Sequence, residues 1–316
     1  MSETKTFEEM FLSSNEEERL KVSKLRILIV GNIKSNFMFV EKLKEWQLSN
    51  LEYFDYIFFV GNFLNLKQGT QNKEEIIPKS EAEITGLITF LENINLNMYY
   101  IGGCTDPITL FATNSPVLTM KSTNLHKKYL KLANDLYVFG MGGSIPTFIN
   151  TYNNENCFLK PFKNYNFDYE YSSGFPYNDN NSKYYGSDKL FINEFKQAFS
   201  ELESEIKEKN STKNIKYILI SNMGPFSSST TYFNLNNNSI VFNGSKQFEK
   251  ELFNNKNIIL NIHGNNNCGK GLSYIGDKCI INPGNLYDGE FVILNLERDK
   301  KSQDWKIKNV NFKKLV

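Results

Sequence analysis

The chain has 316 residues, 40% of them hydrophobic, and a formal net charge of +1. This length is enough to bury a large core, and a net charge near zero argues against nucleic acid and anionic membranes as partners. The polar N-terminus lacks the apolar core of a signal peptide, and no later run approaches the ~20 apolar residues that a bilayer span needs. We therefore expect a cytoplasmic protein, and the lack of a long linker predicts one domain with decorations.

The first 24 residues are predicted to form a helical arm outside the main fold. Phe7, Met10, Phe11 and Leu20 stand among several glutamates, a pattern typical of short amphipathic helical segments. A solvated, frayed arm and a docking segment both fit this pattern. The main domain is predicted to follow, over residues 25–316.

Short apolar stretches typical of strands then alternate with segments whose apolar residues have helical spacing, which predicts an α/β fold. Five stretches each contain an apolar strand that ends at Gly, Ser or Asn and continues into a loop: residues 25–36, 56–65, 98–106, 217–225 and 258–267. We expect helices at residues 37–47, 81–94, 188–209 and 245–254, and surface loops at residues 67–80 and 118–126. Other strands are expected at residues 136–141 and, as an antiparallel end, at residues 278–281, 290–296 and 305–312. Because parallel strands deliver their loops to one edge of a sheet, the five loops predict a cleft.

Residues 150–187 differ in composition, with eleven Phe and Tyr residues spread among Asn, Ser and Gly. They follow neither a period of two nor one of 3.6, so we predict a long irregular insertion. Rigid amphipathic rings favour a contact surface, and packing on the body of the fold is the alternative.

The five loops carry the polar residues of the predicted cleft. In chain order they contain Asn32 and Lys34, then Asn62, then Cys104-Thr105-Asp106, then Asn222, then Asn265 and Asn267, and Asn282-Pro283-Gly284-Asn285 closes the series. Their order and spacing resemble the motifs of the calcineurin-like metallophosphoesterase family, from residue 25 to about residue 296. The resemblance implies a four-layer αββα sandwich, in which two stacked mixed sheets are flanked by helices and two metal ions lie between the loops.

Every metal-ligand position of that family is substituted in this chain. The resemblance aligns Asn32 and Asn62 with aspartates, Lys34, Asn222, Asn265 and Asn267 with histidines, Cys104 with an asparagine and Thr105 with the catalytic histidine, and Asp106 matches the acid that follows it. Divalent ions need anionic oxygens and neutral imidazoles to replace their hydration, and carboxamides and an ammonium group do not supply these. We therefore predict a vestigial cleft with no catalytic residue, no metal and no cofactor.

Three other residue types bear on this prediction. The chain has only two histidines, His126 and His263, and we interpret His263 as structural because it has no carboxylate partner. Lys34 is a candidate anion-binding residue. A nucleophilic role for Cys104 lacks a visible base. The cysteines show no CxxC spacing and are expected to be reduced thiols: Cys104, Cys157, Cys268 and Cys279.

These observations lead to one main hypothesis and two alternatives. The main hypothesis is a catalytically inactive metallophosphoesterase-like protein, a structural or scaffolding subunit that meets protein partners through its aromatic insertion and N-terminal arm. If the polar N-terminus is ordered, something must hold it, and on that ground we expect a large assembly, cytoskeletal or ciliary. The alternatives are an active phosphoesterase or phosphohydrolase with atypical metal use, and a sensor of a small anionic ligand in the vestigial cleft.

Overall fold

The computed structural model describes residues 22–65, 73–92, 98–103, 106, 122–144, 148–153, 156–161, 188–209, 214–236 and 239–316. Three predictions therefore fall wholly or largely outside the described residues. These are the N-terminal arm up to residue 21, the pair Cys104 and Thr105, and the part of the insertion after residue 161.

The first sheet has six strands in the order β18-β17-β1-β2-β3-β4. Its parallel strands are β1 (Lys24–Val30), β2 (Tyr56–Phe59), β3 (Met98–Tyr100) and β4 (Thr123–Asn124). β17 (Glu290–Arg298) and β18 (Trp305–Lys314) add an antiparallel side next to β1. This arrangement makes the sheet mixed, as the sequence predicted.

The second sheet also has six strands, in the order β15-β16-β14-β9-β6-β5. Four of them are parallel to one another: β6 (Leu136–Met141), β9 (Lys216–Ser221), β14 (Ile258–His263) and β16 (Lys278–Asn282). The antiparallel edges are β5 (Lys128–Ala133) and β15 (Gly271–Ile275), which the sequence analysis did not predict. The prediction that residues 278–281 join the antiparallel C-terminal end was wrong, because β16 pairs with β14 in this sheet while β17 and β18 belong to the other.

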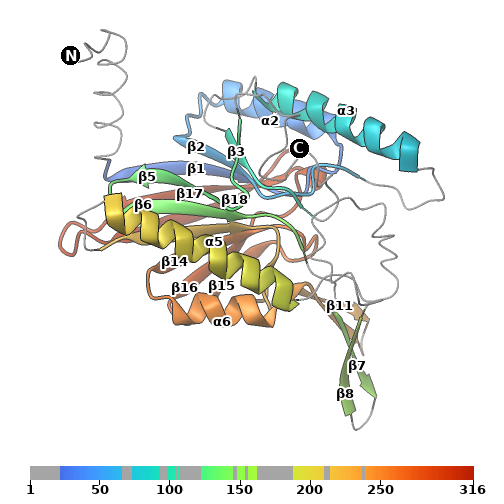
Figure 1. Ribbon diagram of the computed structural model, residues 1–316. Helices are drawn as coiled ribbons and strands as arrows, with labels where there is room; N and C mark the ends of the chain where they lie inside the picture. The colour runs from blue at the N-terminus through green and yellow to red at the C-terminus, as the bar shows by residue number, and fades with distance from the viewer. Residues whose placement is uncertain are drawn as a thin grey trace, which may run out of the picture.

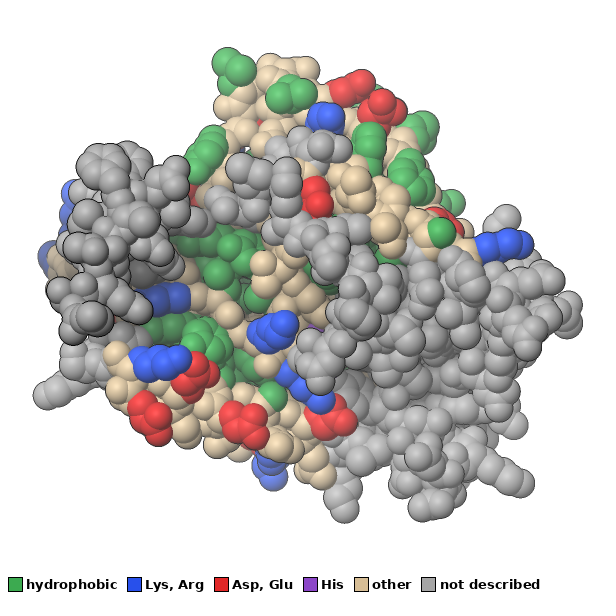
Figure 2. All heavy atoms as spheres, turned by 45° about the horizontal axis from the view of Figure 1, so that its top comes forward, with side chains coloured by type: hydrophobic (Ala, Val, Ile, Leu, Met, Phe, Trp, Pro, Cys, Tyr) green, Lys and Arg blue, Asp and Glu red, His purple; other side chains and the backbone are tan. Residues whose placement is uncertain are grey.

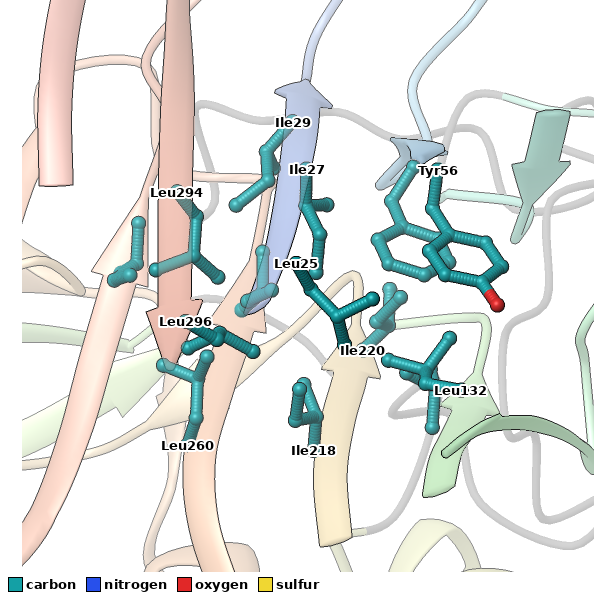
Figure 3. Packing of buried hydrophobic residues seen from close by; sticks show 14 of the residues in the cluster. Leu25, Ile27, Ile29, Tyr56, Leu132, Ile218, Ile220, Leu260, Leu294 and Leu296 are labelled. Carbon is teal, nitrogen blue, oxygen red and sulfur yellow. The ribbon is translucent and has the colours of Figure 1, made fainter. Parts of the chain in front are cut away.

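The two sheets stack face to face, and the interface between them is apolar (Figure 3). Alternate residues of β1 point into it, and Leu25, Ile27 and Ile29 are all buried there with Leu294 and Leu296 of β17. The opposite sheet contributes Ile218 and Ile220 of β9 and Leu260 of β14. Burying each such side chain contributes roughly 1.5–3 kcal/mol, so this layer is a major source of stability.

Helices cover the outer face of each sheet, which completes the predicted four-layer sandwich (Figure 1). α2 (Phe37–Ser49) and α3 (Lys73–Glu92) lie on the first sheet, and α5 (Asp188–Lys209) and α6 (Lys246–Asn254) lie on the second. The predicted apolar stripe of α5 is buried: Phe191, Phe195, Phe199, Leu202 and Ile206. α3 begins inside the region predicted as a surface loop, because Lys and Glu favour helix even where a stretch is polar.

A small four-stranded sheet extends from the side of the sandwich, where Figure 1 shows β7 and β8 projecting away from it. Its order is β11-β12-β7-β8, formed by Tyr232–Asn236, Ser239–Phe242, Phe148–Asn153 and Asn156–Pro161. The first part of the insertion is therefore a β-hairpin and not irregular. Pairing of β7 with the distant β12 provides the order that the local sequence pattern did not reveal.

The remaining described elements are short. β10 (Gly224–Pro225) pairs with β13 (Gly244–Ser245), and one turn of 3-10 helix, η1, spans Leu286–Asp288. On the face in Figure 2, acidic and basic side chains are interspersed, and hydrophobic side chains gather along its upper edge. A search of the described residues found no helix with the length and hydropathy required to cross a membrane.

Candidate functional site

The loops that follow β1, β2, β3, β9 and β14 meet at one edge of the sandwich. The backbone N–H of Asn32 donates to the carbonyl of Gly61 (3.1 Å), and that of Lys34 donates to the carbonyl of Asn62 (3.1 Å). The two sheets are joined here by the Asn222 side chain, whose Nδ2 donates to the carbonyl of Val60 (2.9 Å). Five segments that lie far apart in the sequence thus form a single site.

The backbone of this site is left-handed at several positions. The φ angles are 49° at Asn32 and Lys34, 59° at Asn62 and 63° at Asn265. Asparagine tolerates this conformation better than most residues, because its short side chain can hydrogen-bond locally. Gly103 packs so closely that a Cβ there would lie 2.2 Å from Oδ1 of Asn62. Asparagine and glycine therefore maintain tight loop shapes without contributing charge.

The centre of the site is a chain of buried carboxamides. Asn62 Nδ2 donates to Asn32 Oδ1 (2.9 Å), and Asn32 Nδ2 donates to Asn285 Oδ1 (2.8 Å). Asn285 Nδ2 in turn donates to Asp288 Oδ2 (2.9 Å). The exposed fractions of Asn32, Asn62 and Asn285 are only 0%, 3% and 5%, so each internal bond replaces water. We call these three residues the amide chain.

Asn285 was missing from the predicted site residues. It belongs to the closing Asn-Pro-Gly-Asn sequence, but its bond to Asn32 joins residues 253 positions apart. Only its place at the end of that motif could have indicated a role in the site.

The other predicted cleft asparagines differ in burial. Asn222 is fully buried, and Asn265 is half-buried with its Nδ2 donating to Ser144 Oγ (3.0 Å). The side chain of Asn267 is exposed, and its backbone carbonyl accepts a hydrogen bond from Asn285 Nδ2 (3.0 Å). Cys104 and Thr105 lie outside the described residues, so the structure places no contact for either of them.

Lys34 provides a cation at the rim of the site. Its side chain is half-buried, and its Nζ lies 5.9 Å from the ring centroid of Tyr287, at the distance of a cation–π contact. This contact holds the ammonium group beside the 3-10 turn that follows Asn285. A cation at this position opposes the binding of a divalent metal ion.

Asp106 organises the loops that follow β2 and β3. Its Oδ2 accepts from the backbone N–H of Asn62 (2.8 Å) and of Gly103 (2.7 Å), and its Oδ1 accepts from those of Phe63 (2.8 Å) and Leu64 (3.1 Å). Burial raises the pKa of this fully buried carboxyl group to about 6, against the four N–H donors, which lower it. With both oxygens directed at backbone donors, Asp106 acts as a structural clamp.

Both histidines are buried and hydrogen-bonded within the fold. Nδ1 of His263 lies 2.9 Å from the carbonyl of Gly264, to which it donates, so Nε2 accepts from the Thr230 hydroxyl (2.7 Å). Nδ1 of His126 accepts from the backbone N–H of Gly142 (3.0 Å). Burial lowers the pKa of His263 to about 4 and that of His126 to about 3, so both rings are neutral near pH 7. These contacts fit the structural role predicted for His263.

The side chains present do not fit a pair of divalent ions. No cluster of three or more His, Cys, Asp or Glu side chains that could hold a metal occurs in the part of the chain that the structure describes. Oδ1 of Asn32 and Oδ1 of Asn285 already accept N–H donors from neighbouring amides. A metal ion here would have to break the amide chain, and neutral amide oxygens recover little of its hydration energy.

Comparisons with known proteins identify the fold. No family model matches the chain, and a search of the curated proteins found no match. One matching solved structure has a TM-score of 0.58 and 15% identity over 93% of this chain and 100% of that one. A dimetal phosphatase from Danio rerio has a TM-score of 0.51 and 6% identity over 93% of this chain and 100% of its own. The chain has the metallophosphoesterase fold.

A third match is the calcineurin-like phosphoesterase YfkN from Bacillus subtilis, with a TM-score of 0.44 and 11% identity over 93% of this chain and 91% of that one. At such identities the likeness extends to the fold alone. The chemistry of this metallophosphoesterase fold must therefore be inferred from the contacts of its own residues.

Proposed function

We propose that this chain is a catalytically inactive metallophosphoesterase-like protein that serves as a structural or scaffolding subunit. The amide chain carries the proposal. It occupies the centre of the site with carboxamides that bond to one another, and the resemblance implies carboxylates around two metal ions at Asn32 and Asn62.

Electrostatics support the loss of metal binding. A carboxamide presents an N–H donor on one side, and Asn32 and Asn62 direct these donors into the site. An N–H donor repels a cation, and the ammonium group of Lys34 at the rim adds to this repulsion. Asp106, the carboxylate among the predicted cleft residues, is fully engaged by four backbone donors.

Metal addition tests the proposal directly. Purified protein is heated with and without Mn²⁺, and it is assayed with bis(4-nitrophenyl) phosphate as a generic phosphodiester. We expect no thermal shift and no turnover. A shift of several degrees together with metal-dependent hydrolysis would refute the inactive assignment.

An active enzyme with atypical metal use is the alternative, and elemental analysis of the purified protein separates the two. A stoichiometric transition metal that survives dialysis supports the enzyme. If no such metal is found and the metal-free protein does not hydrolyse phosphomonoesters, the scaffold proposal is supported over the enzyme.

A sensor of a small anionic ligand is the second candidate, and the position of Lys34 at the rim of the site favours it. Phosphate or a nucleotide titrated into the protein in a calorimeter should then give a binding signal that Lys34→Ala abolishes. No heat with the wild-type protein would end this candidate.

The scaffold role requires protein partners, and the aromatic insertion and N-terminal arm are their proposed contact surfaces. A cytoskeletal or ciliary assembly remains the expected setting. Native pull-down followed by mass spectrometry, with an insertion-deleted chain as the matched control, identifies partners that need the insertion. Recovery of the same proteins by both chains would exclude the insertion as the contact surface.

A further inference from the structure

The C-terminal end of α2 carries an exposed apolar patch. The exposed fractions are 65% for Leu48, 91% for Leu51 and 71% for Tyr53. These residues lie on the last turn of α2 and on the connection to β2, and we call them the Leu51 patch. A cluster of exposed apolar side chains marks a contact surface more often than a single exposed apolar residue does.

Leu51 is also held in an unfavourable backbone conformation. The N–H of Glu52 donates to the carbonyl of Gln47 (3.0 Å), and the N–H of Leu51 donates to that of Leu48 (3.2 Å). These two bonds define a Schellman motif, in which glycine usually occupies the left-handed position. Here that position is Leu51, with φ of 50°. A bulky residue in this conformation costs free energy, and in the structure its side chain gains almost no burial in return.

The chain enters the fold beside this patch. Arg26 of β1 forms an ion pair with Glu52, and its backbone N–H donates to Asp55 Oδ2 (2.7 Å). Val22 precedes Arg26 by four residues, which span at most about 14 Å. The segment of residues 1–21 therefore joins the fold within about 14 Å of Arg26, whose side chain contacts Glu52 next to Leu51.

The sequence of residues 1–21 carries an apolar face that matches the Leu51 patch. Phe7, Met10 and Phe11 share one face at helical spacing, and six glutamates outnumber three basic residues in the segment. A groove of about 440 Å³ at the base of β1 is lined by Lys24, Arg26 and Lys308 together with Asp55 and Glu297, and Arg26 and Lys308 already form ion pairs with Glu52 and Glu297. The eleven residues from Phe11 to Val22 cover about 16 Å as a helix and more when extended, which is enough to reach the patch.

We propose that residues 1–21 fold back on their own chain and cover the Leu51 patch, with Phe7, Met10 and Phe11 against Leu48, Leu51 and Tyr53. The exposed leucine in a position suited to glycine is explained as a docking contact. This docking does not depend on whether the cleft binds a metal, and it leaves only the polar face of the arm for the partner contact proposed above.

Limited digestion of the full chain with trypsin tests the proposal, because Arg19 and Lys21 are cleavage sites within the segment. Leu51→Gly removes both the side chain and the strained conformation, so its folded body should be at least as heat-stable as the wild type. Cleavage at Arg19 should nevertheless become at least about tenfold faster, as expected when one leucine side chain loses its burial. Tyr53→Ser, which leaves the turn unchanged, should act in the same direction.

The partner side of the contact and two controls complete the test. Phe7→Ser with Phe11→Ser should speed cleavage as well, and combining these changes with Leu51→Gly should add little, since both remove one contact. Phe253→Ser alters a residue that is 64% exposed at the end of α6 and should leave the rate unchanged. Equal cleavage of wild type and Leu51→Gly would overturn the proposal. Protection that rises with chain concentration would also overturn it, because the segment would then be docking on a second copy.

Discussion

Replacement of Asp106 by alanine should unfold the loops of the cleft or the whole domain. The carboxylate is fully buried and accepts four backbone hydrogen bonds, from Asn62, Phe63, Leu64 and Gly103. Alanine leaves all four donors without a partner, at about 1–3 kcal/mol for each buried group. The sum, about 4–12 kcal/mol, rivals the total stability of about 5–15 kcal/mol that is typical of a folded domain.

Asp106→Asn is the informative comparison. Asparagine retains one acceptor oxygen for two of the four donors and removes the buried charge, whose burial raises the pKa of Asp106 to about 6. We therefore expect the stability order wild type, then Asn, then Ala. Relaxation of the loops and entry of water satisfy some of the four donors. We therefore expect the alanine variant to lose about 4 kcal/mol of unfolding free energy, the lower end of the range.

Urea unfolding at pH 7, monitored by far-UV circular dichroism, measures these differences in unfolding free energy. The comparison holds when the variants share the same dependence of unfolding free energy on urea concentration. Glu249→Ala serves as a control, since Glu249 accepts a single backbone N–H, from Ser227, at an exposed position. A loss of less than about 1 kcal/mol for Asp106→Ala would refute the clamp, because it would mean that water satisfies all four donors.

Three other predictions follow from buried groups. Arg298→Ala removes a bidentate contact with Asp135. Both side chains are partly exposed (19% and 14%), so solvent screens the pair and it contributes less than a fully buried pair would. We expect urea unfolding to show a loss of about 1–3 kcal/mol of unfolding free energy. Burial lowers the pKa of His263 to about 4, below its unfolded value, so its contribution to the free energy of unfolding is complete above pH ~6.5 and declines by about 1.4 kcal/mol per pH unit as pH falls toward 4. In unfolding curves taken at several pH values, His263→Gln should reduce the acid loss of stability by this amount, while the loss due to His126, whose pKa burial also lowers, remains. Leu260→Ala should cost about 2–5 kcal/mol by the same measurement because Leu260 is 0% exposed between the sheets, and an equal effect of Leu272→Ala, at 36% exposure on an edge strand, would contradict this reasoning.

The sequence by itself determined which segments are buried strands and which are outer helices, whereas the four-layer arrangement was implied by the family resemblance. Runs of β-branched and aromatic residues marked the buried parallel strands, and the apolar stripe of α5 marked an outer helix. These signals are local, because burial on one or both faces requires a definite period of apolar residues. The carboxamides at Asn32 and Asn62 were also readable, since residue identity at a loop position needs no coordinates, and the resemblance implies that they stand in place of metal-binding aspartates.

Tertiary structure alone decided which residues meet. It placed β16 beside β14 and not with β17, and it paired β7 with β12 to order the start of an insertion without a local period. It also brought Asn285 to Asn32 across 253 positions of sequence and closed the amide chain. The physical reason is that strand pairing and side-chain hydrogen bonds depend on the packing of distant segments, whereas composition and period report only the burial of each segment by itself.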